Sequence, residues 1–257
     1  YKQMNLNNET ALVTGAASGM GAATAEALAA RGARVAILDI NEAAAKAAAR
    51  KLGGVGIGCD VSNADSAAAA LDEAVEALGA PRVVVSCAGI ALASRIVGRE
   101  GPHDLAAYQQ VINVNLIGTF NILRLAAARM MDQETVSKSG SRGVIINTAS
   151  VAAYEGQVGQ AAYSSSKGGV VALTLPAARE LAQFGIRVMT IAPGLIRTPM
   201  LGGLPEEVQE SLGSQVPFPK RLGQPEEFAS LVEHIVDNEM LNGDVIRLDG
   251  AIRMQPR

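Results

Sequence analysis

The sequence predicts an α/β protein built as one doubly wound (Rossmann) sheet of about seven parallel strands, with helices on both faces. Short runs of apolar and β-branched residues recur along the 257 residues, and segments with helical periodicity separate them. Runs this short that are apolar on both faces are typical of strands in a buried parallel sheet. Because strand and helix alternate from one end to the other, we expect a single domain over residues 1–257.

The expected strands and helices follow one another in a regular order. The segment after the third strand shows the helical pattern most clearly, because Leu71, Val75 and Leu78 return at i, i+4 and i+7. Asp65 can cap the start of that helix. The strand-like runs are residues 10–14, 34–38, 55–59, 83–86, 144–148, 187–191 and 245–248.

Two of the helical segments are unusually rich in alanine, at residues 43–49 and 67–70. Charged residues accompany them at helical spacing. We therefore interpret them as helices that pack closely on the sheet, and not as low-complexity chain.

Two longer segments interrupt this order. Residues 132–143 are polar and rich in Gly and Ser, and we expect a surface excursion there before the fifth strand. Residues 193–225 are rich in Pro and Gly, with one short helical stretch near 206–212. A long irregular segment in a compact α/β domain is often a lid over the functional site. The apolar residues of this expected lid are Leu195, Ile196, Met200, Leu201 and Leu204.

Composition argues against several classes of partner. Apolar residues make up 49% of the chain and charged residues 18%, so a sizeable core can form. The formal net charge of −3 provides no field that would attract nucleic acid or an anionic membrane. Aromatic residues are only 3% of the chain, which leaves few platforms for stacking on single strands. We also expect no membrane span, because no apolar run reaches the necessary length.

Cys59 and Cys87 are the only cysteines, and they lack metal-ligand spacing. We expect two small reduced thiols, no disulfide and no metal site. Residues 1–9 are polar and contain no apolar signal core. Both observations favour a cytoplasmic location.

The first strand–helix–strand unit has the pattern of a dinucleotide site. A strand ends at residue 14, a turn with Gly15, Gly19 and Gly21 follows, a helix runs to about residue 31, and a second strand ends at Asp39. Such glycines let backbone N–H groups approach a pyrophosphate at the helix N-terminus. Glycines alone mark many turns, but all these elements in this order favour a cofactor-binding half over about residues 9–150.

The acid at the end of the second strand indicates which dinucleotide binds. Asp39 is placed to accept hydrogen bonds from the adenosine ribose hydroxyls, and its charge would repel a 2′-phosphate. No Lys or Arg between Gly15 and Gly21 compensates that charge. We therefore expect NAD as the cofactor in preference to NADP.

Two later strand ends contribute to the same cleft. Asp60, after the third strand, can meet the adenine edge or can cap a helix. The small residues Cys87, Ala88 and Gly89 follow the fourth strand, where a turn that exposes its backbone would line the nucleotide.

Only one of the four tyrosines, Tyr163, has a lysine four residues on, at Lys167. On a helix this spacing places both side chains on one face. A phenol titrates near ~10, too high for a base at neutral pH, and a nearby ammonium favours the phenolate. Lys167 therefore makes Tyr163 a plausible general acid/base, although such pairs also occur by chance on many helices.

Two further polar residues are candidates beside this pair, Ser150 in the expected catalytic and substrate half, about residues 144–257, and Asn115 earlier in the chain. Ser150 follows the fifth strand, where its hydroxyl could hydrogen-bond a reacting oxygen as charge develops on it. Asn115 lies within a long helical segment that its amide could distort locally.

Together these motifs resemble the short-chain dehydrogenase/reductase family over essentially the whole chain. The matching stretches are TGAASGMG at 14–21, CAG at 87–89, Asn115, Ser150, YSSSK at 163–167 and PG at 193–194. The resemblance implies hydride transfer with a catalytic tetrad. Tyr163 would exchange the proton with the substrate oxygen, which Ser150 would polarise. Lys167 would bind the nicotinamide ribose and lower the pKa of the tyrosine, while Asn115 would hold a water in the proton relay.

The resemblance also implies which residues contact the cofactor. They are Gly15, Ser18, Gly19, Met20, Gly21, Asp39, Asp60, Val61, Cys87, Ala88, Gly89, Tyr163, Lys167, Pro193, Ile196 and Thr198.

Within the family, the stretches 142–164, 187–199, 214–223 and 241–256 are most similar to a branch that oxidises 3-hydroxyacyl-CoA. The resemblance implies NAD-dependent oxidation of a short-chain 3-hydroxyacyl-CoA to the 3-oxoacyl-CoA, and the reverse, with Ser150 and Tyr163 on the substrate. It also implies a homotetramer, and it makes the mitochondrial matrix the alternative location.

Two other functions stay open at this point. One is a reductase of 3-oxoacyl thioesters or steroids that uses NADPH, against which Asp39 argues. The other is a catalytically silent NAD-binding scaffold, which has no need of Ser150, Tyr163 and Lys167 together. Residues 98–107 and 132–139 match the branch poorly, which leaves the acyl preference open.

The expected lid also bears on the substrate. An apolar lid suits an acyl chain, and the phosphates of CoA need cations near the mouth of the site. Arg197, Lys220 and Arg221 are the only Lys or Arg residues between Pro193 and Pro225. They can meet CoA, or they can simply keep a surface loop soluble.

Overall fold

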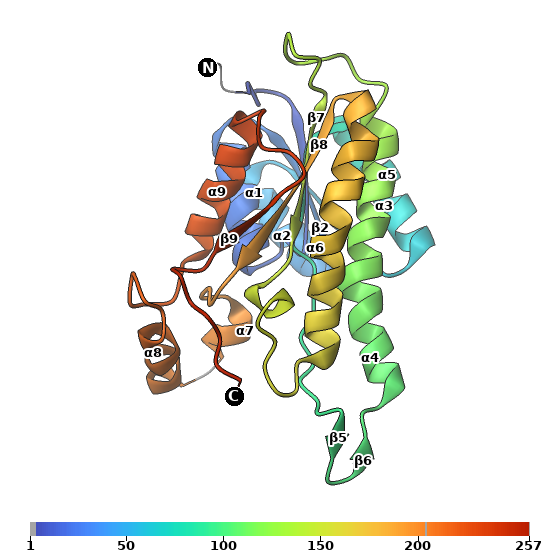
Figure 1. Ribbon diagram of the computed structural model, residues 1–257. Helices are drawn as coiled ribbons and strands as arrows, with labels where there is room; N and C mark the ends of the chain where they lie inside the picture. Colours follow the sequence, from blue (N-terminus) through green and yellow to red (C-terminus); the bar gives the residue numbers. More distant parts are fainter. Residues whose placement is uncertain (1–3, 204, 257) are drawn as a thin grey trace.

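A seven-stranded parallel sheet forms the centre of the molecule (Figure 1). The computed structural model describes residues 4–203 and 205–256, so Leu204 of the expected lid lies outside the described residues. The strands lie in the order β3-β2-β1-β4-β7-β8-β9 and every neighbouring pair is parallel, which confirms the predicted fold class. Their bounds are β1 Thr10–Thr14, β2 Arg34–Asp39, β3 Val55–Gly58, β4 Pro81–Ser86, β7 Gly143–Thr148, β8 Ile186–Pro193 and β9 Val245–Leu248.

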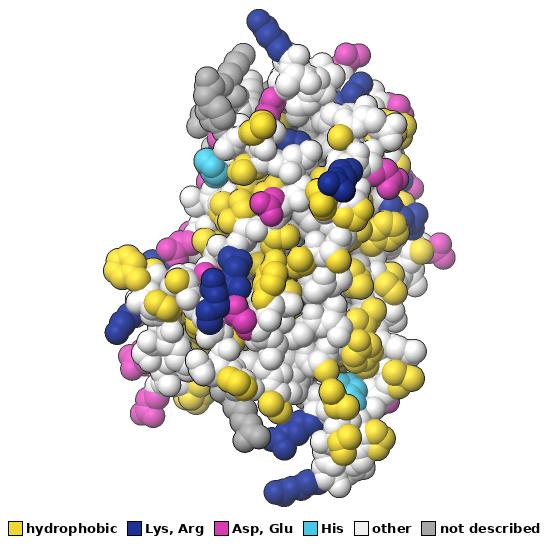
Figure 2. All heavy atoms as spheres, viewed as in Figure 1, with side chains coloured by type: hydrophobic (Ala, Val, Ile, Leu, Met, Phe, Trp, Pro, Cys, Tyr) yellow, Lys and Arg dark blue, Asp and Glu magenta, His cyan; other side chains and the backbone are white. Residues whose placement is uncertain are grey.

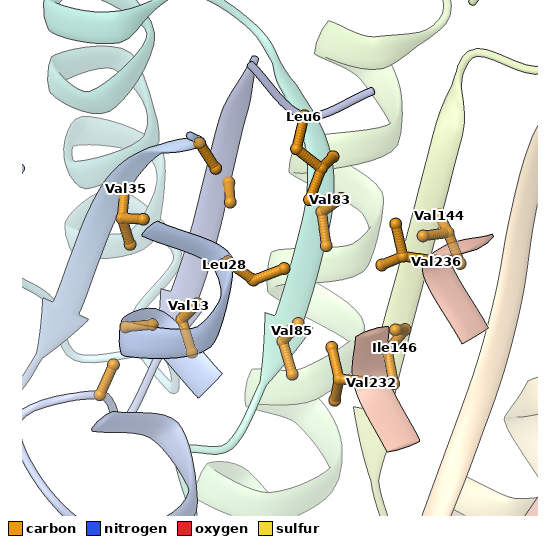
Figure 3. Packing of buried hydrophobic residues seen from close by; sticks show 14 of the residues in the cluster. Leu6, Val13, Leu28, Val35, Val83, Val85, Val144, Ile146, Val232 and Val236 are labelled. Carbon is orange, nitrogen blue, oxygen red and sulfur yellow. The ribbon is translucent and has the colours of Figure 1, made fainter. Parts of the chain in front are cut away.

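Helices cover both faces of the sheet (Figure 1). One layer contains α1 (Gly19–Ala30), α2 (Glu42–Leu52) and α9 (Pro225–Asp237), and the other contains α3 (Ala64–Leu78), α5 (Gly118–Met130) and α6 (Ala161–Leu181). Successive strand residues point to opposite faces. Val13, Val85 and Ile146 therefore join the core under α1 and α9 (Figure 3), whereas their neighbours along each strand join the core under α3 and α5.

The alanine-rich helices pack closely on the sheet, as predicted. Ala45 and Ala49 of α2 are fully buried. A Cβ atom on Gly56 of β3 would lie only 2.4 Å from the backbone of Ala45. Small residues on both sides thus let the backbones of α2 and β3 approach each other.

The cap of α3 differs from the prediction. Asn63, with an extended backbone, is the N-cap residue, and its side chain accepts a hydrogen bond from the backbone N–H of Ser66 (2.9 Å). Asp65 is exposed in the first turn, where its charge still favours the helix dipole. The cap lies two residues earlier than expected because Asn63 provides it.

One helical segment passes the length and composition test for a membrane span. Helix α4 (Leu105–Ile112), the π-helix η1 (Asn113–Ile117) and α5 run on as 26 residues, within which an 18-residue apolar window has a mean hydropathy of 1.4. The expectation that no apolar run reaches that length is therefore wrong. Half of the apolar window is buried within the protein, as in the core helix of a globular fold. The π-turn lies at Asn115, where the sequence predicts a local distortion.

The two irregular segments lie at opposite ends of the molecule. Residues 132–142 form neither helix nor strand, and the guanidinium of Arg82 donates to the carbonyl of Glu134 (2.7 Å) within them. Residues 193–225 contain two short helices, α7 (Pro199–Gly202) and α8 (Glu206–Ser214), where the sequence predicted one. A small hairpin, β5 (Val97–Gly98) with β6 (Gly101–Pro102), projects beyond α4 (Figure 1).

Candidate active site

The turn between β1 and α1 accepts only glycine at two positions. Gly15 has φ +61°, and a Cβ atom there would lie 2.7 Å from the backbone of Ala88. A Cβ atom on Gly21 would lie 2.4 Å from the carbonyl oxygen of Gly15. These contacts are shorter than real Cβ atoms tolerate, so the turn is held open by the absence of side chains. Its backbone N–H groups and the start of α1 suit a pyrophosphate.

A cavity of about 390 Å³ lies above this turn, at the carboxyl ends of β1, β2 and β4. Asp39 lines it and is held by the backbone N–H groups of Ala17 (3.1 Å) and Asn41 (3.0 Å). None of the described residues that line it is Lys or Arg. The residues expected to contact the cofactor that line this cavity are Gly15, Ser18, Gly19, Met20, Gly21, Asp39, Asp60, Val61, Cys87, Ala88, Gly89 and Thr198.

Asp60 lies in the same cavity, and its alternative role as a helix cap is excluded. Its carboxylate accepts hydrogen bonds from the backbone N–H (2.9 Å) and the hydroxyl (2.6 Å) of Ser62, while Asn63 caps α3. The carboxylate is therefore fixed at the wall of the cavity.

A second cavity of about 430 Å³ brings together Ser150, Tyr163 and Lys167. It shares Met20 and Cys87 with the first cavity, so the two lie next to each other. Ser150 comes from the turn after β7, where its hydroxyl accepts a hydrogen bond from the N–H of Ala152 (3.1 Å). Pro193 and Ile196, two further residues expected at the cofactor, line this second cavity.

Burial dominates the electrostatics of the Tyr163–Lys167 pair. Lys167 is buried, and its Nζ donates to the carbonyl of Thr148 (2.8 Å) and lies 5.8 Å from the centre of the Tyr163 ring. Burial lowers the pKa of Lys167 to about 8. Burial also raises the pKa of Tyr163 above its usual range, and a hydrogen bond with Ser150 opposes that shift only in part. Desolvation and Ser150 account for the shift, so the expected lowering of the tyrosine pKa by Lys167 is not seen.

Asn115 lies close to the catalytic residues but does not line either cavity. Its side chain is fully buried. The amide Oδ1 accepts from the N–H of Ile90 (2.8 Å), and Nδ2 donates to the carbonyl of Ile90 (2.9 Å) and to the hydroxyl of Ser166 (3.0 Å). The role of Asn115 in holding a water stays a prediction. The Asn115 side chain fastens the Gly89–Ile90 turn to α6.

The three cations of the lid segment lie outside the catalytic cavity. The Arg221 guanidinium makes a two-point ion pair with Glu227 (2.8 and 2.8 Å) and holds the pKa of that carboxyl at about 2. Arg197, Lys220 and Arg221 are all absent from the described lining of the catalytic cavity. The charge of Arg221 is thus already paired with Glu227.

The C-terminal segment contributes a wall that the sequence did not reveal. Met254 lines the catalytic cavity, and its backbone N–H donates to Glu155 (3.2 Å), just after Ser150. Arg247 of β9 joins this segment to Glu155 (2.7 Å) and to Asp249 (2.7 Å). Other lining residues that sequence patterns did not indicate are Ala91, Leu92, Ala93, Val151, Ala152, Gln157, Gln160 and Leu212.

Comparisons with known proteins place this geometry among oxidoreductases. A family model described as short chain dehydrogenase matches residues 9–209. The chain is 56% identical over 250 residues to human 3-hydroxyacyl-CoA dehydrogenase type-2, covering 96% of this chain and 95% of that protein. The Drosophila melanogaster protein of the same name is 49% identical over 255 residues, covering 98% of this chain and all of that protein.

More distant relatives and a solved structure agree. A mouse (3R)-3-hydroxyacyl-CoA dehydrogenase is 37% identical, covering 98% of this chain and 99% of that protein. The crystal structure of 3-hydroxyacyl-CoA dehydrogenase type-2 from Mycobacterium avium has a TM-score of 0.92 at 42% identity. The match covers 97% of this chain and 98% of that one.

Proposed function

Because the chain belongs to the short chain dehydrogenase family, we propose that it oxidises a short-chain 3-hydroxyacyl-CoA to the 3-oxoacyl-CoA with NAD, and catalyses the reverse reaction. The observation that carries this proposal is the adjacency of two cavities that share lining residues, one suited to a dinucleotide and one that holds Ser150, Tyr163 and Lys167. The names of relatives at 49% and 56% identity support an acyl-CoA substrate. Apolar residues such as Leu195, Leu201 and Met254 around the second cavity suit a short acyl chain.

The preference for NAD rests on charge. Asp39 and Asp60 present two carboxylates to the dinucleotide cavity, and no described Lys or Arg lines it. The ribose hydroxyls of NAD can donate to Asp39, whereas a 2′-phosphate would meet its negative charge. We therefore expect NAD to be used in preference to NADP.

The chain's own residues would handle the proton. When bound, the nicotinamide ring supplies the acceptor for the hydride from C3 of the substrate. Tyr163 Oη would take the proton of the C3 hydroxyl, and the Ser150 hydroxyl would hydrogen-bond the same oxygen. Lys167 lies on the same helix face as Tyr163, and its ammonium would favour the phenolate and bind a ribose hydroxyl. Asn115 would act indirectly, by holding the Gly89–Ile90 turn in position.

We further propose that the protein self-associates, as the family resemblance implies, into a homotetramer. Supporting this, Ile117 of η1, Phe120 of α5 and Leu175 of α6 are 48%, 47% and 44% exposed. Large apolar side chains at such exposure on neighbouring helices suit a surface covered by a second copy of the chain.

The test is an assay of 3-hydroxybutyryl-CoA, a hydroxysteroid and a simple secondary alcohol, each with NAD and with NADP. We expect the acyl-CoA with NAD to give the highest kcat/KM, at least about tenfold above NADP, which corresponds to ~1.4 kcal/mol. Turnover of the steroid or the alcohol alone would discard the acyl-CoA assignment and leave the dehydrogenase assignment standing. Tighter binding of NADPH than NADH would contradict the role of Asp39.

The same assay tests the catalytic residue. Tyr163→Phe keeps the ring but removes the exchangeable proton, so kcat should fall by about 10²–10⁴-fold while NADH binding stays nearly unchanged. Tyr154→Phe is the control, because Tyr154 is half-exposed beside Arg247 and lies outside the cavity lining. Near-native turnover by the Tyr163→Phe variant would exclude Tyr163 as the acid/base. If the native protein turned over none of the substrates, a catalytically silent NAD-binding scaffold would be favoured.

A further inference from the structure

Two segments that are distant in the chain lie side by side at the catalytic cavity (Figure 1). One is the turn after β7, residues 150–158, and the other is the C-terminal segment, residues 252–256. Ser150 and Gln157 of the turn line the cavity, and so does Met254 of the C-terminal segment. The C-terminal segment forms neither helix nor strand, so its place depends on the side-chain contacts that it makes.

The carboxylate of Glu155 joins the two segments. It makes a two-point ion pair with the guanidinium of Arg247 in β9 (2.7 and 3.1 Å), and this pairing lowers the pKa of Glu155. The same carboxylate accepts a hydrogen bond from the backbone N–H of Met254 (3.2 Å). Nε of Arg253 lies 3.4 Å from it. One side chain of the turn thus contacts β9 and the C-terminal segment together.

Arg247 is held on more than one side. Its Nε donates to the carboxylate of Asp249 (2.7 Å), and its Nη2 donates to the carbonyl of Ile252 (3.1 Å). The guanidinium also lies 5.3 Å from the centre of the Tyr154 ring. Figure 2 shows basic and acidic side chains grouped on the face that carries β9 and the C-terminal segment. Arg247 therefore connects the turn to the start of the C-terminal segment.

Two further hydrogen bonds join the outer ends of these segments. The backbone N–H of Val158 donates to the carbonyl of Pro256 (3.0 Å), and Nε2 of Gln157 donates to the carbonyl of Gln255 (2.9 Å). Both bonds lie beyond Met254 in the chain. The part of the C-terminal segment that lines the cavity is thus held through Glu155 and Arg247.

The ion pair can affect the reaction although neither side chain lines the described part of the catalytic cavity. The Glu155 and Arg247 side chains are 19% and 22% exposed, so salt and water screen their attraction less than at an open surface. A guanidinium that binds both oxygens of a carboxylate also fixes the orientation of the two groups. Position matters here, because displacing a reacting group by about 1 Å can cost about 10²-fold in rate.

We propose that Glu155 is a positioning residue, which holds the turn that carries Ser150 against the C-terminal segment so that Met254 closes one side of the substrate cavity. This inference rests on the proposed function, because Ser150 and Met254 act on the substrate there. Glu155 itself acts through these two residues. Loss of its charge should therefore disturb substrate binding and the reacting geometry together, and should spare the cofactor.

The test compares Glu155→Gln with the native enzyme on whichever substrate the native enzyme turns over fastest. The variant keeps the size of the side chain and removes the charge that Arg247 binds. We expect KM for the substrate to rise about tenfold and kcat to fall about tenfold, since Met254 and Ser150 both lose their fixed positions. KM for NAD should stay nearly unchanged, because none of residues 150–158 or 247–256 is part of the described lining of the dinucleotide cavity.

Asp237→Asn is the matched control. The Arg31–Asp237 ion pair has the same 2.7 Å distance and similar exposure, 20% and 11%, but it joins α1 to α9 away from the catalytic cavity. If Glu155 only stabilised the fold, both variants would lose turnover through a smaller folded fraction and keep the native KM. Met254→Ala leaves the ion pair intact, and it should raise KM with little change in kcat.

Hydrogen–deuterium exchange of residues 252–256 keeps this inference separate from the proposed activity. The Met254 amide should exchange at least about tenfold faster in Glu155→Gln and at the native rate in Asp237→Asn. Absence of turnover of any 3-hydroxyacyl-CoA by the native protein would discard the proposed function and leave this result standing. Native exchange or native KM in Glu155→Gln, equal effects in Asp237→Asn, or native KM in Met254→Ala would overturn the positioning role.

Discussion

At the scale of single residues, desolvation sets the protonation of the candidate site. Lys167 is buried with one carbonyl partner and no carboxylate among its described contacts, so its ammonium is poorly compensated. Cys87, which lines both cavities, is partly buried near it, and desolvation raises the pKa of this thiol to about 11. A buried cation without a counter-charge destabilises the folded protein. Such destabilising groups are common at functional sites.

This cost predicts a pH-dependent effect of Lys167→Met. The folded pKa of about 8 lies below the usual value of 10.5, so between these pH values the unfolded chain holds a proton that the folded chain has lost. Stability due to this group therefore rises with pH through the window, and the full penalty applies below pH 8. The free energy of unfolding of the variant should exceed that of the native protein by most near pH 7. The pH-dependent part of this difference should be on the order of 3 kcal/mol.

Denaturant unfolding of both proteins at pH 7, 8.5 and 10 measures this difference. The loss of the hydrogen bond to Thr148 changes the free energy of unfolding equally at each pH, so the slope with pH is the informative quantity. A difference that stays constant from pH 7 to 10 would contradict the lowered pKa of Lys167.

At the scale of elements, close backbone approach shapes the cofactor cavity. The start of α1 lies against the end of β1 and the turn after β4, where Gly21 and Gly15 leave no room for a Cβ atom. The obstacles are backbone atoms, which cannot rotate away as a side chain can. A methyl group there must push α1 outward from the turn.

Gly21→Ala should therefore weaken NADH binding by at least about tenfold and destabilise the protein by ~1–3 kcal/mol. Gly168→Ala is the matched control in α6, because a Cβ atom there meets nothing within 4 Å. Alanine favours a helix interior over glycine, so this control should be neutral or more stable by up to ~1 kcal/mol. Fluorescence titration with NADH and thermal unfolding measure both effects, and equal behaviour of the two variants would refute the steric argument.

At the scale of the whole molecule, the exposed faces of η1, α5 and α6 carry apolar side chains that do not pack into the core. Half of the apolar window of residues 105–130 is buried against the fold, and Ile117 and Phe120 point out of it. A surface of this kind is suited to a second copy of the chain, which would bury it.

Phe120→Glu should weaken self-association, because a carboxylate would replace a ring at the proposed contact. We expect the dissociation constant to rise on the order of 100-fold, or ~2.7 kcal/mol, seen as a lower mass in light scattering at micromolar concentration. Phe218→Glu is the control, since Phe218 is 82% exposed on the lid, away from these helices. A native mass for the Phe120→Glu variant, or a native chain that is already monomeric, would disprove this contact.

The fold was largely predictable because its signals are local. Each of the seven sheet strands was expected within a few residues of its observed bounds, since apolar and β-branched runs between helical segments identify a buried parallel sheet. The turn with Gly15, Gly19 and Gly21 and the i, i+4 spacing of Tyr163 and Lys167 are also local patterns. Sequence spacing therefore determined the order of the elements, the cofactor turn and the helix face that carries the tyrosine.

Other features depended on contacts between residues distant in the chain. The Asn115 amide is consumed by Ile90 and Ser166, Arg221 is neutralised by Glu227, and Met254 reaches the catalytic cavity from the C-terminal segment. None of these pairings has a periodic signature. The pKa shifts of Tyr163 and Lys167 likewise follow from burial, which exists only when the layers have packed. Tertiary structure alone decided which polar groups are free to bind a substrate, because a side chain's availability depends on the partners that folding brings to it.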